Sequence, residues 1–265
     1  MEKPNVVFGD SLIFFLRLIP TFKVFKYAGK TLKGFGKKNE IYKDILKNIK
    51  NRKNMEYVFF GFGGVDLHLS FYYDFFIKKN NFNSISSIEK EWKKNINMNI
   101  EQYVKNISEI KTDAKKVVLG VFPSPLKKKI IHHSLYFYIQ LDYNSLDDKK
   151  KKLFDKLNET KYRIARLNYF NKILKRNCEK YGIIFKNHNN LILNKDKKVK
   201  KELVDLAEYN IHLLHEPLLK ILSKLPFYKK LGITKEVVDK LDKIFKQYLE
   251  DKKKEIEKRK KKKNY

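Results

Sequence analysis

A serine that directly follows a short apolar segment is the first residue of this sequence that could carry chemistry. Val6-Val7-Phe8 leads into Gly9-Asp10-Ser11-Leu12, and an apolar run follows. This order predicts a strand, a tight turn and a helix, with the Ser11 hydroxyl at the C-terminal edge of a sheet, where open α/β sheets place their chemistry. The first N–H groups of such a helix have no intrahelical partner and could bind an anion beside Ser11. The alternative is that Asp10-Ser11 only caps the helix, because both residue types are favoured at the N-cap.

Strands alternate with helices along most of the chain, which predicts a parallel sheet with right-handed crossovers. The expected strands are Asn5–Gly9, Phe22–Ala28, Tyr57–Phe62, Val117–Phe122 and Ile183–Lys186. The expected helices are Glu40–Asn51, Ser87–Thr112 with caps at Ser86-Ser87, Asp147–Tyr181 as one helix or two, Lys198–Leu225, and a segment from Thr234 onward. Leu126–Ser145 interrupts the alternation and predicts a hairpin or flap.

Length and composition favour a single α/β domain with a sizeable core. The chain has 265 residues, 42% of them hydrophobic, and contains no Gly/Ser-rich linker. We therefore expect residues 1–233 to form the α/β domain and residues 234–265 a basic C-terminal helix or tail. The single cysteine, Cys178, excludes an internal disulfide and is interpreted as a core residue. No apolar run is long enough to span a membrane, and the first residues leave no room for a signal peptide, so we expect a cytoplasmic protein.

The formal net charge of +30 is the most unusual feature of the composition. Such a charge attracts nucleic acids, anionic membranes and acidic glycans without a dedicated site. However, lysine greatly outnumbers arginine, whereas specific reading of phosphates and bases favours arginine. Lys252–Lys263 is almost entirely lysine, arginine and glutamate, so we expect polyanion binding by this tail to be non-specific.

Three further segments follow the serine in a meaningful order. Tyr27-Ala28-Gly29-Lys30-Thr31 comes after the second expected strand, and Phe62-Gly63-Gly64-Val65-Asp66-Leu67-His68 after the third. Tyr209-Asn210-Ile211-His212 comes late in the chain, followed by Leu213-Leu214-His215-Glu216-Pro217. Together with Gly9-Asp10-Ser11-Leu12, this series resembles the SGNH hydrolases, also called the GDSL family, in a variety whose third block reads Phe-Gly-x-Val-Asp. The resemblance implies a three-layer, flavodoxin-like α/β sandwich with a parallel sheet of about five strands and helices on both faces.

The resemblance also implies roles for individual residues. Ser11 would be the nucleophile, and its N–H and that of Gly29 would bind the oxyanion of a tetrahedral intermediate. His212 would take the serine proton and return it to the leaving group. Glu208, four residues before His212, could orient the imidazole if that segment were helical.

The chain departs from the family pattern in two places. Val65 stands where the family has an oxyanion-binding asparagine, and Tyr209 stands where it has the aspartate that orients the histidine. His68 could donate into the site in place of the asparagine, although a surface histidine is the plainer interpretation. Gly63 and Gly64 could serve the oxyanion or only form a turn, and Asp66 could act in the site or only hold a helix or loop.

The sequence therefore leaves three functions open. The first is a serine esterase or acyltransferase acting on O-acyl groups of a glycan or small metabolite through a Ser11–His212 dyad. The second is a member of the same fold that has lost efficient turnover and serves as a binding or scaffold module. The third is a basic nucleic-acid-associated protein. We expect no cofactor and no metal, because no His, Cys and carboxylate set has the spacing of a metal site.

Overall fold

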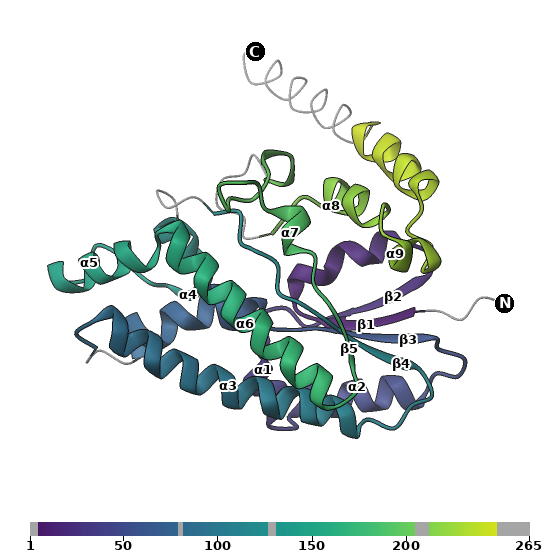
Figure 1. Ribbon diagram of the computed structural model, residues 1–265, viewed down its shortest axis with the longest axis horizontal. Helices are drawn as coiled ribbons and strands as arrows, with labels where there is room; N and C mark the ends of the chain where they lie inside the picture. The colour runs from purple at the N-terminus through teal and green to yellow at the C-terminus, as the bar shows by residue number, and fades with distance from the viewer. Residues whose placement is uncertain (1–4, 79–81, 127–130, 205–211, 248–265) are drawn as a thin grey trace, which may run out of the picture.

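A five-stranded parallel sheet forms the centre of the protein (Figure 1). The computed structural model describes residues 5–78, 82–126, 131–204 and 212–247. The strands are β1 (Asn5–Gly9), β2 (Phe22–Lys26), β3 (Tyr57–Gly61), β4 (Lys115–Leu119) and β5 (Ile184–Lys186). Their order, β2-β1-β3-β4-β5, is that of flavodoxin-like folds, in which ligands bind where the strand order reverses. Here that point lies at the C-terminal ends of β1 and β3.

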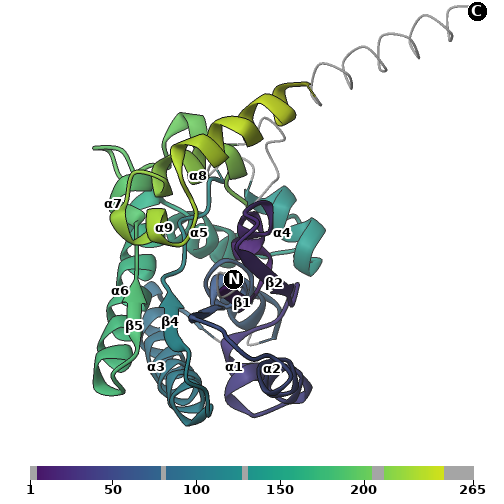
Figure 2. The same ribbon diagram turned by 90° about the vertical axis from the view of Figure 1, so that its right-hand side faces the viewer.

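Helices cover both faces of the sheet, as the sequence predicts. Val6 and Phe8 face one core and Val7 faces the other, as the two-residue period of a strand requires. The first core is covered mainly by α1 (Leu32–Gly36), α2 (Glu40–Lys50), α3 (Ile85–Glu109), α5 (Asp148–Leu157) and α6 (Thr160–Lys180). The second is covered by the 3-10 helix η1 (Ser11–Leu18), by α8 (His215–Leu222), α9 (Pro226–Lys230) and the helical residues 235–247, with α7 (Asn189–Ile192) beside them. Figure 2 shows α1, α2 and α3 below the sheet and α8 and α9 above it. The three-layer, flavodoxin-like α/β sandwich is confirmed.

Most predicted elements are present with small shifts of their ends. The expected helix over 147–181 is two helices, α5 and α6, which meet at Asn158 and Glu159. The expected caps of α3 at Ser86-Ser87 are wrong, because Ser84 is the extended residue whose hydroxyl oxygen accepts the N–H of Ser87. Serine residues two or three apart offer the same N-cap signal, so the sequence alone did not separate them.

Two expected segments differ in type from the structure. The expected hairpin at 126–145 contains a helix, α4 (Ile131–Ile139), and residues 127–130 lie outside the described part. The helices expected over 198–225 are present only in part, and residues 205–211 lie outside the described part. A short 3-10 turn, η5 (Lys201–Leu203), is followed by Val204, which forms an antiparallel bridge with Leu213, and α8 begins at His215. The bridge interrupts the helical pattern that the sequence suggested on either side of it.

The aromatic segment after β3 belongs to the core. Phe71, Tyr72, Phe75 and Phe76 are all buried, within and around the π-helical turns η2 (Asp66–Ser70) and η3 (Tyr73–Lys78). These four rings are therefore packed inside the protein and are not available for base stacking, whereas Tyr73 beside them is exposed. Cys178 is also fully buried, as predicted.

The beginning of the basic C-terminal segment packs onto the sandwich. Val238 is 1% exposed and belongs to the same core as α8 and α9, and Lys220 pairs with Asp242 at 2.8 Å. Residues 248–265, which include the lysine-rich tail, lie outside the described part. The helix 235–247 is thus continuous with the core of the α/β domain, although the sequence suggested a boundary at residue 234.

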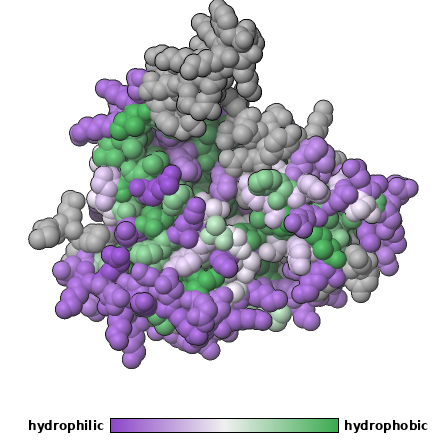
Figure 3. All heavy atoms as spheres, turned by 180° about the vertical axis from the view of Figure 1, so that it is seen from behind, coloured by the Kyte–Doolittle hydropathy of each residue, from purple (hydrophilic) through white to green (hydrophobic). Residues whose placement is uncertain are grey.

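Much of the surface is hydrophilic. Hydrophilic residues cover the lower part of the face drawn in Figure 3, and apolar residues form groups mainly above them. Within the described residues, no helix combines the length and the apolar character needed to cross a membrane.

Candidate active site

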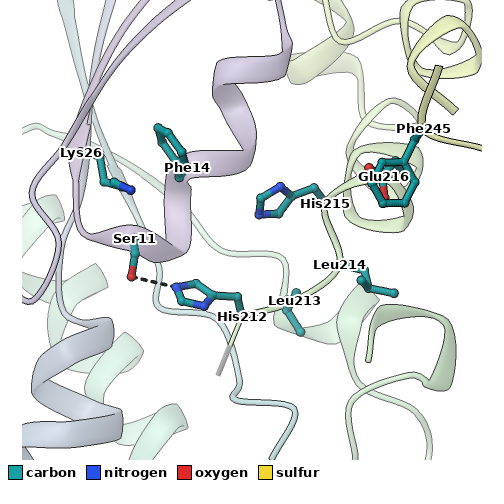
Figure 4. Close-up of a pocket in the computed structure, with 9 residues that line it drawn as sticks. All are labelled: Ser11, Phe14, Lys26, His212, Leu213, Leu214, His215, Glu216 and Phe245. Carbon is teal, nitrogen blue, oxygen red and sulfur yellow. Dashed lines mark hydrogen bonds between the residues drawn. The ribbon is translucent and has the colours of Figure 1, made fainter. Parts of the chain in front are cut away.

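The turn after β1 holds Ser11 without using its hydroxyl as a helix cap. Asp10 has the extended backbone of an N-cap residue, and its Oδ1 accepts the N–H of Leu12 at 2.9 Å. The Oγ of Ser11 instead lies 2.8 Å from Nε2 of His212, which is 201 residues away in sequence (Figure 4). The capping interpretation therefore applies to Asp10, and the Ser11 hydroxyl is directed at an imidazole.

The carboxylate of Asp10 also anchors this turn to the loop after β3. Its Oδ2 accepts the N–H of Gly64 at 2.9 Å. A Cβ at Gly64 would lie 2.1 Å from Cδ1 of Leu12, so only glycine permits this close approach. Burial raises the pKa of Asp10 to about 6, and backbone N–H groups of both turns partly offset this rise. Asp10 is thus the residue that positions the Ser11 turn.

His212 lies on the extended segment that leads into α8. The neighbouring Leu213 is buried and bridges to Val204, which fixes the backbone beside the imidazole. Burial lowers the pKa of His212 below its usual 6.5, and the positive charges of His215 and Lys26 lower it further. The imidazole is therefore mostly neutral near pH 7. With its proton on Nδ1, Nε2 can accept the proton of the Ser11 hydroxyl.

A cleft of about 330 Å³ opens beside Ser11 and His212. It is lined by Ser11, Phe14, Lys26, His212, Leu213, Leu214, His215, Glu216 and Phe245 (Figure 4). These side chains come from η1, the end of β2, the segment entering α8 and the helix 235–247. Such a volume lies at the lower end of the range for small-molecule sites, which suits a short acyl group or a single sugar.

Residues of the third sequence block hold the loop after β3 and the start of α1 in place. Oδ2 of Asp66 accepts the N–H of Leu32 at the start of α1, at 2.8 Å, so this carboxylate holds a helix end. Burial, opposed by that hydrogen bond and reinforced by the nearby charge of Asp10, raises the pKa of Asp66 to about 7. Gly63 has a positive φ of 117°, and the N–H of Gly64 is occupied by Asp10. These contacts are those of a turn and its anchor, and Gly63, Gly64 and Asp66 are not among the residues that line the cleft.

His68 is partly buried, and its ring contacts the chain after β4. Its Nε2 lies 2.9 Å from the carbonyl oxygen of Phe122, and burial lowers its pKa to about 4. The neutral ring therefore donates Nε2–H to that carbonyl and holds the chain after β4. His68 is not among the residues that line the cleft.

The structure describes Gly29 but not Glu208. Gly29 lies in the exposed turn after β2, with a left-handed φ of 71° and open space where a Cβ would be. Its place at the edge of the sheet, one strand from Ser11, is the one that the resemblance implies for an oxyanion donor. Glu208, together with Tyr209, lies outside the described residues, so its proposed role in orienting His212 stays a prediction.

Several residues of the site received no functional role from the sequence, and Asp10 was expected only as a helix cap. Asp10 supports the turn, and Phe14, Lys26 and Phe245 line the cleft. A signal existed for Asp10, because aspartate after a strand and before a helix is a strong N-cap. Lys26 is the last residue of a strand, at the sheet edge where open α/β sheets place their active sites. No local sequence pattern identifies Phe245 as a residue of the cleft. Within the described residues, no cluster of three His, Cys, Asp or Glu side chains could hold a metal ion.

Comparison with known proteins finds structural likeness only. No protein-family model matches the sequence, and no curated protein matches it significantly. An extracellular lipase from Streptomyces rimosus is 13% identical, with 84% of this chain and 99% of that chain aligned and a TM-score of 0.48. An aryl esterase from M. smegmatis is 9% identical, with 91% and 99% aligned and a TM-score of 0.42.

A gut microbial diltiazem-metabolizing enzyme is 15% identical, with a TM-score of 0.42; 72% of this chain aligns with it but only 38% of the enzyme's own length is covered. Because all three TM-scores are below 0.5, the fold class rests on the strand order and layers of this chain itself. Those features are the ones that the resemblance to SGNH hydrolases implies.

Proposed function

We propose that this protein is a serine ester hydrolase of the SGNH type, with Ser11 as nucleophile and His212 as general base. The observation that carries this proposal is the 2.8 Å separation of Ser11 Oγ and His212 Nε2 at the C-terminal edge of the sheet. Two residues so far apart in sequence, one of them at the switch point of the strand order, form the pair that nucleophilic catalysis needs. The lowered pKa of His212 keeps its imidazole in the basic form.

The reaction would proceed through an acyl-enzyme. His212 Nε2 takes the Ser11 proton while Oγ attacks the ester carbonyl carbon, and the carbonyl oxygen becomes an oxyanion. The backbone N–H groups of Ser11 and Gly29 would stabilise this oxyanion. Its collapse breaks the bond to the alcohol oxygen, which takes the proton from the imidazolium. Water then attacks the acyl-enzyme with His212 again as base, releasing the acid and restoring Ser11.

The substrate that we propose is an O-acyl group on a glycan or a small metabolite. The cleft accommodates a short acyl group, and a sugar hydroxyl could replace water in the second step, which would make the protein an acyltransferase. The general class, an ester attacked by serine, is the same in both cases.

A second function, a binding module on the same fold, is favoured by one observation. Val65 offers no hydrogen-bond donor at the place of the family's asparagine, and the N–H of Gly64 beside it is engaged by Asp10. Loss of one oxyanion donor lowers the rate by about 10²–10³-fold. A protein that retains Ser11 and His212 but turns over slowly could bind an acylated ligand instead.

The experiment compares the wild-type protein with Ser11→Ala and His212→Gln. Hydrolysis of a short-chain aryl ester and labelling by a serine-directed fluorophosphonate are measured on each. We expect both variants to lose ester hydrolysis by at least about 10³-fold, and Ser11→Ala to lose labelling altogether. Ser86→Ala, an exposed serine on α3, is the matched control and should behave as wild type. Equal activity in wild type and a folded Ser11→Ala protein would refute the enzyme and leave the binding module.

A further inference from the structure

Lys26 is fixed beside the nucleophile by the main chain of the sheet. It is the last residue of β2 and pairs with Gly9, two residues before Ser11. The next residue, Tyr27, donates its N–H to the carbonyl of Gly9 at 2.8 Å, so the pairing continues to the very end of both strands. The Lys26 side chain therefore starts at the edge of the sheet from which Ser11 projects, and it lines the same cleft (Figure 4).

The ammonium group of Lys26 rests on an aromatic ring that a second cation shares. Its Nζ lies 4.3 Å from the ring centroid of Phe14, and the guanidinium carbon of Arg17 lies 4.0 Å from the same centroid. Among the described residues, no ion pair joins Lys26 or Arg17 to a carboxylate, whereas Lys220, for instance, pairs with Asp242. Two cations on one ring repel each other, so an anion near them would be attracted by both.

Charged side chains are distributed unevenly along the cleft. Lys26 lies at the end where Ser11 and His212 meet, and its charge contributes to the lowered pKa of His212. The carboxyl-bearing residue of the cleft, Glu216, lies at the other side near Phe245 (Figure 4). The Glu216 side chain is buried, and burial raises its pKa. The end of the cleft where an ester would react is therefore positive.

We propose that the ester substrate carries an anionic group, and that Lys26 binds this group while Ser11 attacks the carbonyl. This inference rests on the proposed hydrolase function and names its substrate class: acyl esters with a carboxylate, phosphate or sulfate near the scissile bond. A lysine ammonium is a compact point charge that accepts any of these anions. Arg17, whose guanidinium lies over the same Phe14 ring, adds to the attraction. The plain alternative is that Lys26 is one more exposed lysine of a chain with a charge of +30.

The test uses esters matched in size that differ in charge. One pair is 4-nitrophenyl butyrate and 4-nitrophenyl hemisuccinate, which places the charge on the acyl side. The other is the acetate esters of 3-carbamoylphenol and 3-hydroxybenzoate, which places it on the alcohol side. Lys26→Met removes the charge and keeps the length, and Lys26→Arg keeps the charge. Lys23→Met is the matched control, because Lys23 is an exposed lysine of the same strand and does not line the cleft.

We expect Lys26→Met to raise KM about fivefold for the anionic member of at least one pair, with little change for its neutral partner. Lys26→Arg should restore most of the preference, Lys23→Met should leave it intact, and added salt should weaken it in the wild type. Equal loss on neutral and anionic esters would overturn the proposal, because Lys26 would then act on every ester. No change on either would overturn it too. If the protein is not a serine hydrolase, the wild type and Ser11→Ala will cleave the neutral esters equally. That result is distinct from a failure of the Lys26 proposal.

Discussion

The carboxylate of Asp10 and the N–H of Gly64 join two turns that are 54 residues apart, at a distance of 2.9 Å. The first turn carries Ser11, and the second follows the neighbouring strand β3. Because the other oxygen of Asp10 accepts the N–H of Leu12, a single buried carboxylate fixes the start of η1 against the sheet. The orientation of the nucleophile therefore depends on a residue that does not itself line the cleft.

Replacing Asp10 should lower the reactivity of Ser11. An asparagine has one accepting oxygen in place of two, so Asp10→Asn leaves one of the two N–H groups facing an amide NH2. We expect the fluorophosphonate labelling rate to fall about 10–100-fold, because small displacements of a nucleophile are costly. Asp10→Ala should in addition reduce the free energy of unfolding by about 2–4 kcal/mol in urea denaturation, since two buried donors lose their acceptor. An unchanged labelling rate in a folded Asp10→Asn protein would contradict the positioning role.

Asp66 should make the protein less stable as pH rises toward neutrality. Its pKa in the folded state is about 7 against 3.8 for the free group, so the folded state holds the proton more tightly. The resulting stabilisation is present below pH 3.8 and is lost as pH rises through about 7. At about 1.4 kcal/mol for each pKa unit, its upper limit is about 4 kcal/mol. Asp66→Asn, which can still accept the Leu32 N–H, should flatten this part of the stability curve measured between pH 5 and 8. A curve of unchanged slope would show that Asp66 is not the titrating group.

The pH dependence of activity should reflect the lowered pKa of His212. The acid limb of kcat/KM is expected below pH 6.5, because burial and the charges of His215 and Lys26 disfavour the imidazolium. His215→Gln removes one of these charges, so the limb should move upward in pH. Asp10, with a pKa of about 6, could titrate in the same range, and the profile of Asp10→Asn separates its contribution. A downward shift in His215→Gln would contradict the assignment of the limb to His212.

Gly63 and Gly29 should respond very differently to alanine, although both have positive φ. At Gly63 a Cβ would lie 2.6 Å from Cζ of Phe170 and 2.9 Å from Cγ2 of Val121. We expect Gly63→Ala to lower the free energy of unfolding by about 3 kcal/mol through strain and overpacking. Gly29→Ala meets nothing within 4 Å, so the backbone strain alone should reduce stability by about 1 kcal/mol. Thermal or urea unfolding of the two variants gives the comparison. Equal losses would show that the crowding at Gly63 relaxes freely.

The sequence predicted the sheet and the Ser11 turn well because both depend on local signals. The apolar strand Val6–Phe8, the glycine after it and the N-cap preference of aspartate are all contained within a few residues. The positions of Gly29 and His68 near strand ends were likewise readable from the strand pattern. The order of the sequence blocks also suggested the pair Ser11 and His212, although only the structure gives their separation.

The remaining features depend on contacts between distant segments. The bridge between Val204 and Leu213 lies within a segment whose residue pattern suggested helix, and the pairing itself leaves no pattern in the sequence. The segment Leu135-Tyr136-Phe137-Tyr138 has residue types that favour strands, yet it is helical in α4, where Leu135 packs into the core. Two further features also depend on contacts between distant segments. The ring of His68 contacts the chain after β4, and Phe245 lines the cleft beside Ser11.

The separation of 201 positions between Ser11 and His212 in the sequence has a consequence for biosynthesis. Domains generally fold from the N-terminus as the chain emerges, and here β1 and its turn are among the first segments available. The general base becomes available only when His212 has been synthesised, and Phe245 of the cleft follows later still. A nascent or truncated chain can therefore form much of the sheet while lacking the dyad. In the proposed esterase, Ser11 therefore lacks its general base until His212 has been synthesised.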